Sequence, residues 1–266
     1  MTAATIADAR TVPTHAPGLV RSAARIAAVE LRLLLREPGV LVGLVGFPAA
    51  TVLIIAGVFG SAPDPEFGGV RPTEHYVVGY LGVVLAQVGL VSLPVHLASH
   101  RELGVTRRYR ASGVSGATQI LSSAGLGTVL AVLGGLVVLV VGGAAYGVPT
   151  PVDPFAVLLW LTAGVACFVA IGLALGTLLP SSRAANAVGN LLFVPMFLLG
   201  GGGPPRDVMT GPMQTLSDVL PLSHVVGGIR HAWLGRTDDP QALWWTAAVA
   251  ALAVALAIRT ARRRSS

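Results

Sequence analysis

The stretch ATQILSSAGLGTVLAVLGGLVVLVVGGAAY, from Ala117 to Tyr146, contains no acidic, basic or histidine side chain. It lies inside a longer run, 111–152, that is also free of charged residues. A helix needs roughly 20 mostly apolar residues to cross the hydrocarbon core of a membrane. This stretch therefore predicts a membrane-spanning helix.

The composition of the whole chain agrees with that assignment. Charged residues make up 11% of the 266 residues and hydrophobic residues 53%, whereas soluble domains carry about 25% charged residues. Further charge-free runs predict five more spans, at about 40–60, 76–98, 155–179, 186–203 and 242–258. We expect an all-α polytopic membrane protein with six transmembrane helices.

A basic amphipathic helix is predicted before the first span, over residues 19–37. Its arginines recur at intervals of 4, 7 and 4 residues and so share one stripe of the helix: Arg21, Arg25, Arg32 and Arg36. Such a helix lies in the membrane interface, and Pro38 is expected to end it. We expect residues 1–18 to be a disordered tail, 19–258 to be the transmembrane domain and 259–266 to be a basic tail.

The placement of arginine predicts the orientation of the spans. With the N-terminus in the cytoplasm, 14 of the 18 basic residues lie in cytoplasmic segments and only four lie outside: Arg71, Arg206, Arg230 and Arg236. A basic excess marks the cytoplasmic loops of membrane proteins. We therefore expect both termini in the cytoplasm, with anionic lipids as partners of the basic residues. No aromatic interleaving or motif indicates binding to nucleic acid.

All 18 basic residues are arginine, and the chain contains no lysine. The phosphate-binding P-loop needs a lysine that reaches the β- and γ-phosphates of the nucleotide. We therefore expect no ATPase site and no cofactor in this chain, which is not predicted to be an enzyme. Any ATP-driven activity would need a separate subunit. No charged side chain lies in the middle of a span, which argues against an ion-coupled transporter.

Two short patterns point to other chemistry. Gly113-Val114-Ser115-Gly116 matches the nucleophile pattern of rhomboid intramembrane proteases, so an intramembrane serine protease is the alternative function. A serine nucleophile needs a histidine within hydrogen-bond reach, and none of the later spans contains one. His96 and His100 lie four residues apart, but no glutamate lies between them and no third ligand is nearby in the sequence, so no metal site is predicted.

The loop between the second and third spans, 101–115, reads RELGVTRRYRASGVS. An acid and a glycine come first, a basic helical turn follows, and Ser-Gly-Val-Ser leads into the next span. This order resembles the cytoplasmic loop of type-2 ABC exporter permeases, which include drug and antibiotic permeases of actinobacteria. The chain departs from the family pattern at Tyr109, where leucine is usual, and at Gly113, where proline is common. The segment 220–235 also resembles the Pro-Leu…Arg…Gly segment of that family.

The resemblance implies the permease subunit of an ATP-driven exporter in a bacterial cell membrane. Two copies of a separate ATPase bind the ATP, a second permease copy of the same or a different kind completes the path, and a small lipophilic or amphipathic compound leaves the cell. The residues implied to couple the permease to the ATPase are Arg101, Glu102, Gly104, Arg107, Arg108 and Arg110. A broken, re-entrant outer gate is expected after the fifth span, with Pro204, Pro205, Pro221 and Arg230. Lipid and polysaccharide exporters share this architecture, so the cargo stays open.

Overall fold

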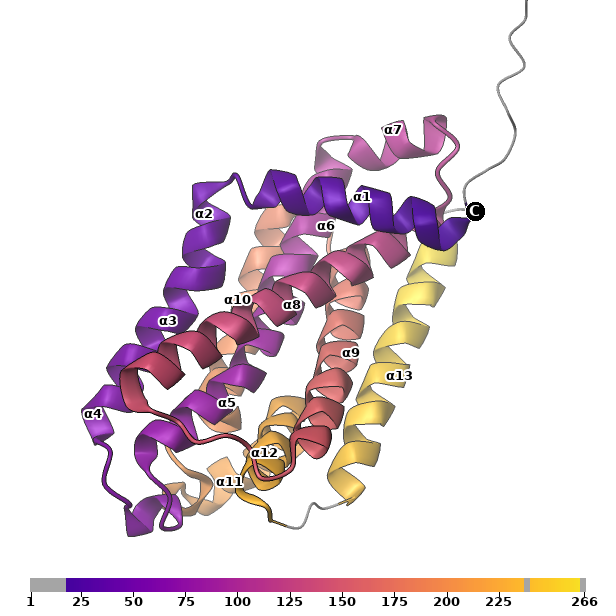
Figure 1. Cartoon of the computed structure of the whole chain (residues 1–266). Helices are drawn as coiled ribbons and strands as arrows, with labels where there is room; N and C mark the ends of the chain where they lie inside the picture. The colour runs from indigo at the N-terminus through magenta and orange to yellow at the C-terminus, as the bar shows by residue number, and fades with distance from the viewer. Residues whose placement is uncertain (1–17, 237–239, 264–266) are drawn as a thin grey trace, which may run out of the picture.

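The computed structural model describes residues 18–236 and 240–263, which form helices joined by short loops, with no strand in either range. Long helices run between two ends of a bundle (Figure 1). Within the described residues, five helices are long and apolar enough to cross a membrane, and a sixth, shorter apolar helix covers Phe47–Phe59. The all-α membrane fold expected from the sequence is confirmed. Residues 1–17 of the predicted tail and 264–266 of the basic tail lie outside the described ranges.

Four of the long helices follow the expected spans closely. They are α8 (Gly116–Tyr146), α9 (Pro154–Leu178), α10 (Ser182–Gly200) and α13 (Pro240–Arg263). A side-chain oxygen caps the start of each of the first three, because Ser115, Asp153 and Ser181 each accept a hydrogen bond from the backbone N–H three residues later. Such caps satisfy N–H groups that have no partner inside the helix. The polar residues before each apolar run therefore fix where the helix begins.

The second span is longer than the expected 76–98 and contains an irregular turn. After the short 3-10 helix η3 (Pro65–Phe67), helix α5 (Pro72–Gln87) continues through the π-helical segment η4 (Val88–Ser92) into α6 (Leu93–Glu102). Almost every residue of α5 is buried, so this span forms the centre of the bundle.

Glycines bring two neighbouring helices very close to the π segment. A Cβ atom built on Gly189 of α10 would lie 2.2 Å from the carbonyl oxygen of Leu90. One built on Gly172 of α9 would lie 2.6 Å from the carbonyl oxygen of Gly89. Helix backbones approach this closely only where small residues meet, which is a common packing device in membranes. The glycines therefore allow α9 and α10 to pack closely against the central span.

The first span departs most from expectation. The chain is helical from Pro38 to Phe59, but the turns alternate between α (α2, Pro38–Leu41; α3, Phe47–Thr51; α4, Gly57–Phe59) and π (η1, Val42–Gly46; η2, Val52–Ala56). Pro48 lies in the middle of this region and has no N–H to donate, which disfavours a regular α ladder. The expected 40–60 span is thus represented by the shorter apolar helix.

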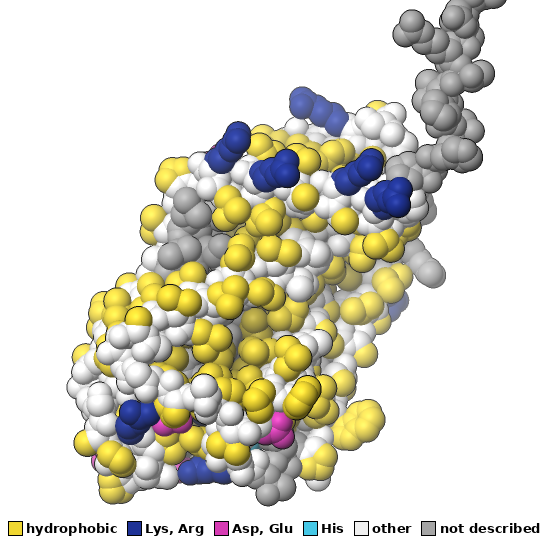
Figure 2. All heavy atoms as spheres, in the orientation of Figure 1, with side chains coloured by type: hydrophobic (Ala, Val, Ile, Leu, Met, Phe, Trp, Pro, Cys, Tyr) yellow, Lys and Arg dark blue, Asp and Glu magenta, His cyan; other side chains and the backbone are white. Residues whose placement is uncertain are grey.

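Helix α1 (Leu19–Leu34) lies across one end of the bundle and packs on α8, and the short helix α7 (Val105–Ala111) lies at the same end (Figure 1). Helix α1 ends before the expected residue 37, since Pro38 starts the next helix. Its three arginines are exposed, as is Arg36 in the turn that follows, whereas Ala23 and Glu30 on another face are buried. Figure 2 shows basic side chains in a row along this part of the surface. We call this the basic end.

The opposite end is built from η5 (Arg206–Val208), α11 (Gly211–Val219) and α12 (Pro221–Leu234) (Figure 1). Helix α12 packs against α5 and α9 and buries most of its apolar side chains there. The start of α1 and the end of α13 both lie at the basic end (Figure 1). An even number of crossings would give this arrangement.

Candidate functional site

The loop singled out by its sequence forms a separate short helix at the basic end. Helix α6 ends at Glu102, and Gly104 adopts a left-handed backbone with φ of 71°, which turns the chain into α7. Glycine adopts this conformation without steric cost. Leu103, between the two, leaves 68% of its surface exposed. Helix α7 therefore projects from the bundle at a turn that favours glycine.

Three of the predicted coupling residues form an exposed basic surface on α7. The side chains of Arg107, Arg108 and Arg110 are exposed, whereas Tyr109 between them is half-buried. We call the three arginines the α7 basic face. Exposed charges of one sign steer a partner of the opposite sign and fix its orientation more than they raise affinity.

The other two charged residues of the predicted set point back to the bundle. The Arg101 guanidinium donates hydrogen bonds to the carbonyl oxygens of Gly176 and, at 2.5 Å, of Leu179. Gly176 lies in the last turn of α9 and Leu179 directly follows the helix, where carbonyls lack partners within the helix. Glu102 accepts a hydrogen bond of 2.6 Å from the hydroxyl of Ser182 at the start of α10. Arg101 and Glu102 thus attach the base of α7 to the junction between α9 and α10.

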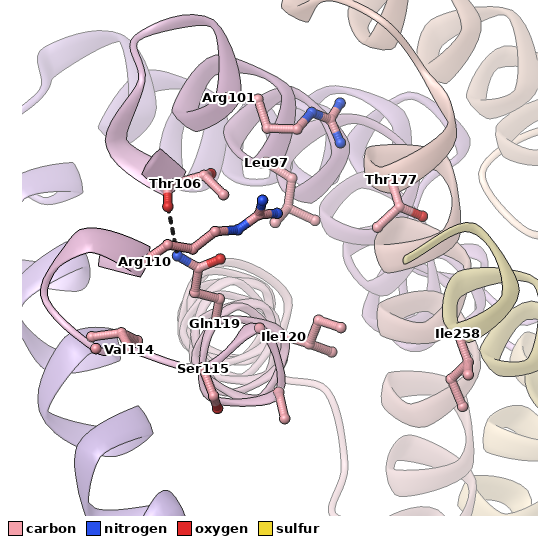
Figure 3. Close-up of a pocket in the computed structure, with 13 residues that line it drawn as sticks. Leu97, Arg101, Thr106, Arg110, Val114, Ser115, Gln119, Ile120, Thr177 and Ile258 are labelled. Atoms are coloured by element: carbon pink, nitrogen blue, oxygen red, sulfur yellow. Dashed lines mark hydrogen bonds between the residues drawn. The ribbon is translucent and has the colours of Figure 1, made fainter. Parts of the chain in front are cut away.

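A cavity of about 770 Å³ lies at the basic end, lined by α6, α7, α8, α9 and α13 (Figure 3). Arg101 and Arg110 supply its positive charge, and most of the remaining lining is apolar or small. Figure 3 shows Thr106 and Gln119 facing each other, with the Gln119 amide donating to the Thr106 carbonyl at 3.4 Å. The cavity is therefore amphipathic, with its charge next to α7.

Ser115, the nucleophile of the alternative function, acts as a helix cap. Its Oγ accepts the backbone N–H of Thr118 at 3.1 Å and lies 2.8 Å from the Thr118 hydroxyl. Ser115 also lines the cavity, and no histidine is among the described residues that line it. Ser115 is therefore paired with Thr118 in a helix cap, and the described residues that line the cavity supply no histidine as its general base.

The residues of the predicted gate meet at the opposite end. Arg230 of α12 donates to the His75 carbonyl at 3.2 Å and to the Gly201 carbonyl at 3.1 Å, so it joins α12 to α5 and to the turn after α10. Pro221 is buried at the start of α12. Pro204 and Pro205 lie in the turn between α10 and η5. Arg230 is thus a cross-link of this end as the structure stands.

A bidentate ion pair holds the neighbouring turn. Arg206 of η5 donates to the carboxylate of Asp218 in α11 at 3.0 Å and 2.6 Å. This hydrogen bonding to Asp218 raises the pKa of Arg206. Both side chains are more than half exposed, so the pair orders a surface turn.

Sequence reasoning missed a polar cluster beneath α1. Glu30 is buried, and its carboxylate oxygens lie 3.4 Å from His96 Nε2 and 3.7 Å from His100 Nδ1. Glu30 follows Arg25 by five residues, which places it about 140° around the helix from the arginine stripe. An acid on the apolar face of an interfacial helix was the available signal. The third potential ligand, absent from the sequence near His96 and His100, comes from α1.

A family model described as ABC-2 type transporter matches residues 24–234. No curated protein matches the chain. The matched range begins within α1 and ends at the last residue of α12, so it includes α7, the cavity's neighbouring helices α8 and α9, and the turn of the predicted gate.

Proposed function

Because the chain belongs to the ABC-2 type transporter family, we propose that this permease subunit drives export with a separate ATPase. The observation that carries the proposal is the α7 basic face, which projects from the bundle where a partner can reach it. The lack of lysine supports an ATPase site on another subunit, since the P-loop needs one. In this proposal the chain is not itself an enzyme and binds no cofactor of its own.

The basic end faces the cytoplasm of a bacterial cell. This orientation follows from the excess of arginine on α1, on α7 and near the end of α13, because basic residues accumulate in cytoplasmic segments. Anionic lipids of the inner leaflet then contact the exposed arginines of α1. The abundance of alanine, glycine and arginine without lysine fits a high-GC bacterium such as an actinobacterium.

Displacement of the ATPase is transmitted to the spans through the end of α6, directly before α7. Arg107, Arg108 and Arg110 pair with acidic side chains of the ATPase, and Gly104 supplies the turn about which α7 is held. Arg101 and Glu102 transmit the displacement, because their hydrogen bonds join α7 to the ends of α9 and α10. Two ATPase copies act on two permeases, which are either identical or different. When the two ATPases close on ATP, the spans change between an inward-facing and an outward-facing state.

The exported compound is lipophilic or amphipathic, and drug-like or antibiotic-like in size. The amphipathic cavity at the basic end supports entry of such a molecule from the cytoplasmic side. A second, almost wholly apolar cavity of about 300 Å³ lies between α5, α8 and α9 and supports passage of apolar groups. Pro204, Pro205, Pro221 and Arg230 form the outer gate, where the turn after α10 meets α12.

The test co-expresses the permease with a candidate ABC ATPase subunit that carries a P-loop. The triple variant Arg107→Ala, Arg108→Ala, Arg110→Ala is compared with a control that loses the same charge from α1: Arg21→Ala, Arg25→Ala, Arg32→Ala. We expect the α7 variant to reach the membrane, to lose co-purification of the ATPase in a salt-dependent way, and to lose substrate-stimulated ATP hydrolysis. The control should keep both. Equal behaviour of the two variants would remove the coupling role of the α7 basic face.

A second comparison separates docking from transmission. Glu102→Gln and Ser182→Ala each weaken the hydrogen bond between α6 and α10 without touching the α7 basic face. Both variants should keep the ATPase bound and lose transport-coupled hydrolysis. Full turnover in both would show that this contact transmits nothing.

A further inference from the structure

Three polar side chains from helices far apart in the sequence meet beneath α1. Glu30 comes from α1, and His96 and His100 come from successive turns of α6. One potential ligand atom from each of the three lies within 4.8 Å of the other two. Glu30 leaves 6% of its surface exposed, so its carboxylate is largely removed from water. A buried carboxylate is costly unless a cation or hydrogen-bond donors compensate its charge.

The separations are long for hydrogen bonds and suit a shared metal ion. Nitrogen-to-oxygen hydrogen bonds are usually about 2.7–3.2 Å long, whereas the two contacts here are 3.4 Å and 3.7 Å. Zinc ligands lie about 2.0–2.2 Å from the ion at tetrahedral angles, which puts neighbouring ligand atoms roughly 3.4 Å apart. Two histidines four residues apart on one helix are a known zinc-binding pair. The cluster thus has the ligand types of a zinc site, and the 3.4 Å separation of His96 from Glu30 equals the spacing expected of two zinc ligands.

We propose that Glu30, His96 and His100 form a binding site for a divalent transition metal ion, with zinc as the ion that two imidazoles and one carboxylate suit. The ring centroids of His96 and His100 are 4.0 Å apart, so two protonated imidazoles would repel each other at this distance. Neutral imidazoles that share a cation avoid that repulsion and compensate the Glu30 charge. Three protein ligands leave a fourth position for water.

The arginines nearest in the sequence to Glu30 and His100 do not point toward the cluster. The three arginines of α1, Arg21, Arg25 and Arg32, lie on the stripe away from Glu30, and their side chains are exposed, as is that of Arg36 in the turn after α1. Arg101, next to His100, donates to the end of α9. The metal is therefore the cation that Glu30 can share with both histidines.

Tyr109 of α7 extends the cluster to the neighbouring helix. Burial raises the pKa of the Tyr109 phenol, and the charge of the Glu30 carboxylate and a hydrogen bond with it raise that pKa further. Tyr109 is thus a neighbour of the Glu30 carboxylate, and polar neighbours of this kind orient metal ligands. Tyr109 occupies the position where the resembling family usually has leucine. The site consequently joins α1 and α6 around one ion, with Tyr109 of α7 beside it.

The experiment measures metal on the full-length chain, purified in detergent through a tag without histidine. The protein is stripped with a chelator, loaded with zinc, separated from free ion and assayed by mass spectrometry of the metal. We expect one zinc per chain and a rise in Tm on adding zinc to the stripped protein. Glu30→Gln, His96→Ala and His100→Ala should each lose stoichiometric zinc. His224→Ala, which changes a histidine at the opposite end, should keep it.

A variant that replaces one metal ligand by another distinguishes loss of the site from misfolding. On a Cys167→Ala background, His100→Cys should still bind one ion, and loading with cobalt should give a thiolate charge-transfer band that the parent lacks. Tyr109→Phe should weaken zinc binding about tenfold. Less than one zinc in the parent, equal zinc in the ligand variants, or no charge-transfer band would overturn the proposal. These readouts need no ATPase, so their failure leaves the proposed export function untouched.

Discussion

Replacing Gly189 by alanine should separate α10 from the central span. The new methyl carbon would lie 2.2 Å from the Leu90 carbonyl oxygen, 3.1 Å from the Leu90 carbonyl carbon and 3.3 Å from the Val91 Cα. All three are backbone atoms, so no side chain can rotate away. Since ordinary contact begins at 3.4 Å, the two helices would have to move apart by about 1.2 Å.

The energetic cost follows from that displacement. Inserting a methyl group into a packed interior typically costs about 1–3 kcal/mol. Alanine also favours a helix over glycine by up to about 1 kcal/mol in water, which offsets part of the cost. A matched control isolates the packing effect. Gly143→Ala adds the same methyl to α8, where nothing beyond the adjacent backbone of α8 itself lies within 4 Å of the new carbon.

The assay is thermal unfolding of the two purified variants in the same detergent. We expect Gly143→Ala to match or exceed the parent Tm, and Gly189→Ala to fall several degrees below the control. Gly189→Ser should behave like Gly189→Ala, because it adds a carbon at the same place. Equal Tm values for the position 189 and position 143 variants would refute the close approach of α10 to the π segment.

Three further outcomes are expected. Thr106→Cys on a Cys167→Ala background should react with an impermeant thiol reagent only from the cytoplasmic side, and labelling from outside in intact cells would reverse the orientation. Arg230→Ala leaves the carbonyls of His75 and Gly201 without their donor, which costs about 1–3 kcal/mol for each carbonyl that stays buried. The yield of monodisperse protein should therefore fall, and an unchanged yield and Tm would contradict the cross-link. Arg206→Ala should cost only about 0.2–1 kcal/mol, because its ion pair with Asp218 is exposed, and a larger loss would mean that this turn supports the gate.

The long spans were predictable because the absence of charged residues is enough to mark the middle of each one. Helices α8, α9 and α13 begin and end near the charge-free runs, where polar caps adjoin apolar sequence. The second span was underestimated, since Glu74, Arg101 and Glu102 ended the apolar run while the helix continued through them. The π turns of the first span arise from local backbone geometry, which hydrophobicity does not encode.

The site was predictable only where side chains face outward. Arginine clusters in the loop indicated the exposed face of α7, because such charges need no partner within the chain. Arg101 was assigned to the same surface, yet its hydrogen bonds go to the end of α9. That partner lies more than 70 residues away in the sequence and is set by helix packing. Glu30 was given no role for the same reason, since its histidine neighbours become visible only once the fold brings α1 against α6.

The π segment Val88–Ser92 also bears on how relatives of this chain should be aligned. A π turn contains one residue more than an α turn, so a relative with a regular helix here has one residue fewer. A one-residue gap placed inside this segment keeps Gly82 against Val226 and His96 near Glu30. The same gap placed in regular α5 would rotate everything after it by about 100°. Length variation among homologous second spans should therefore collect in this turn, where a residue can be gained or lost while both flanking helices keep their neighbours.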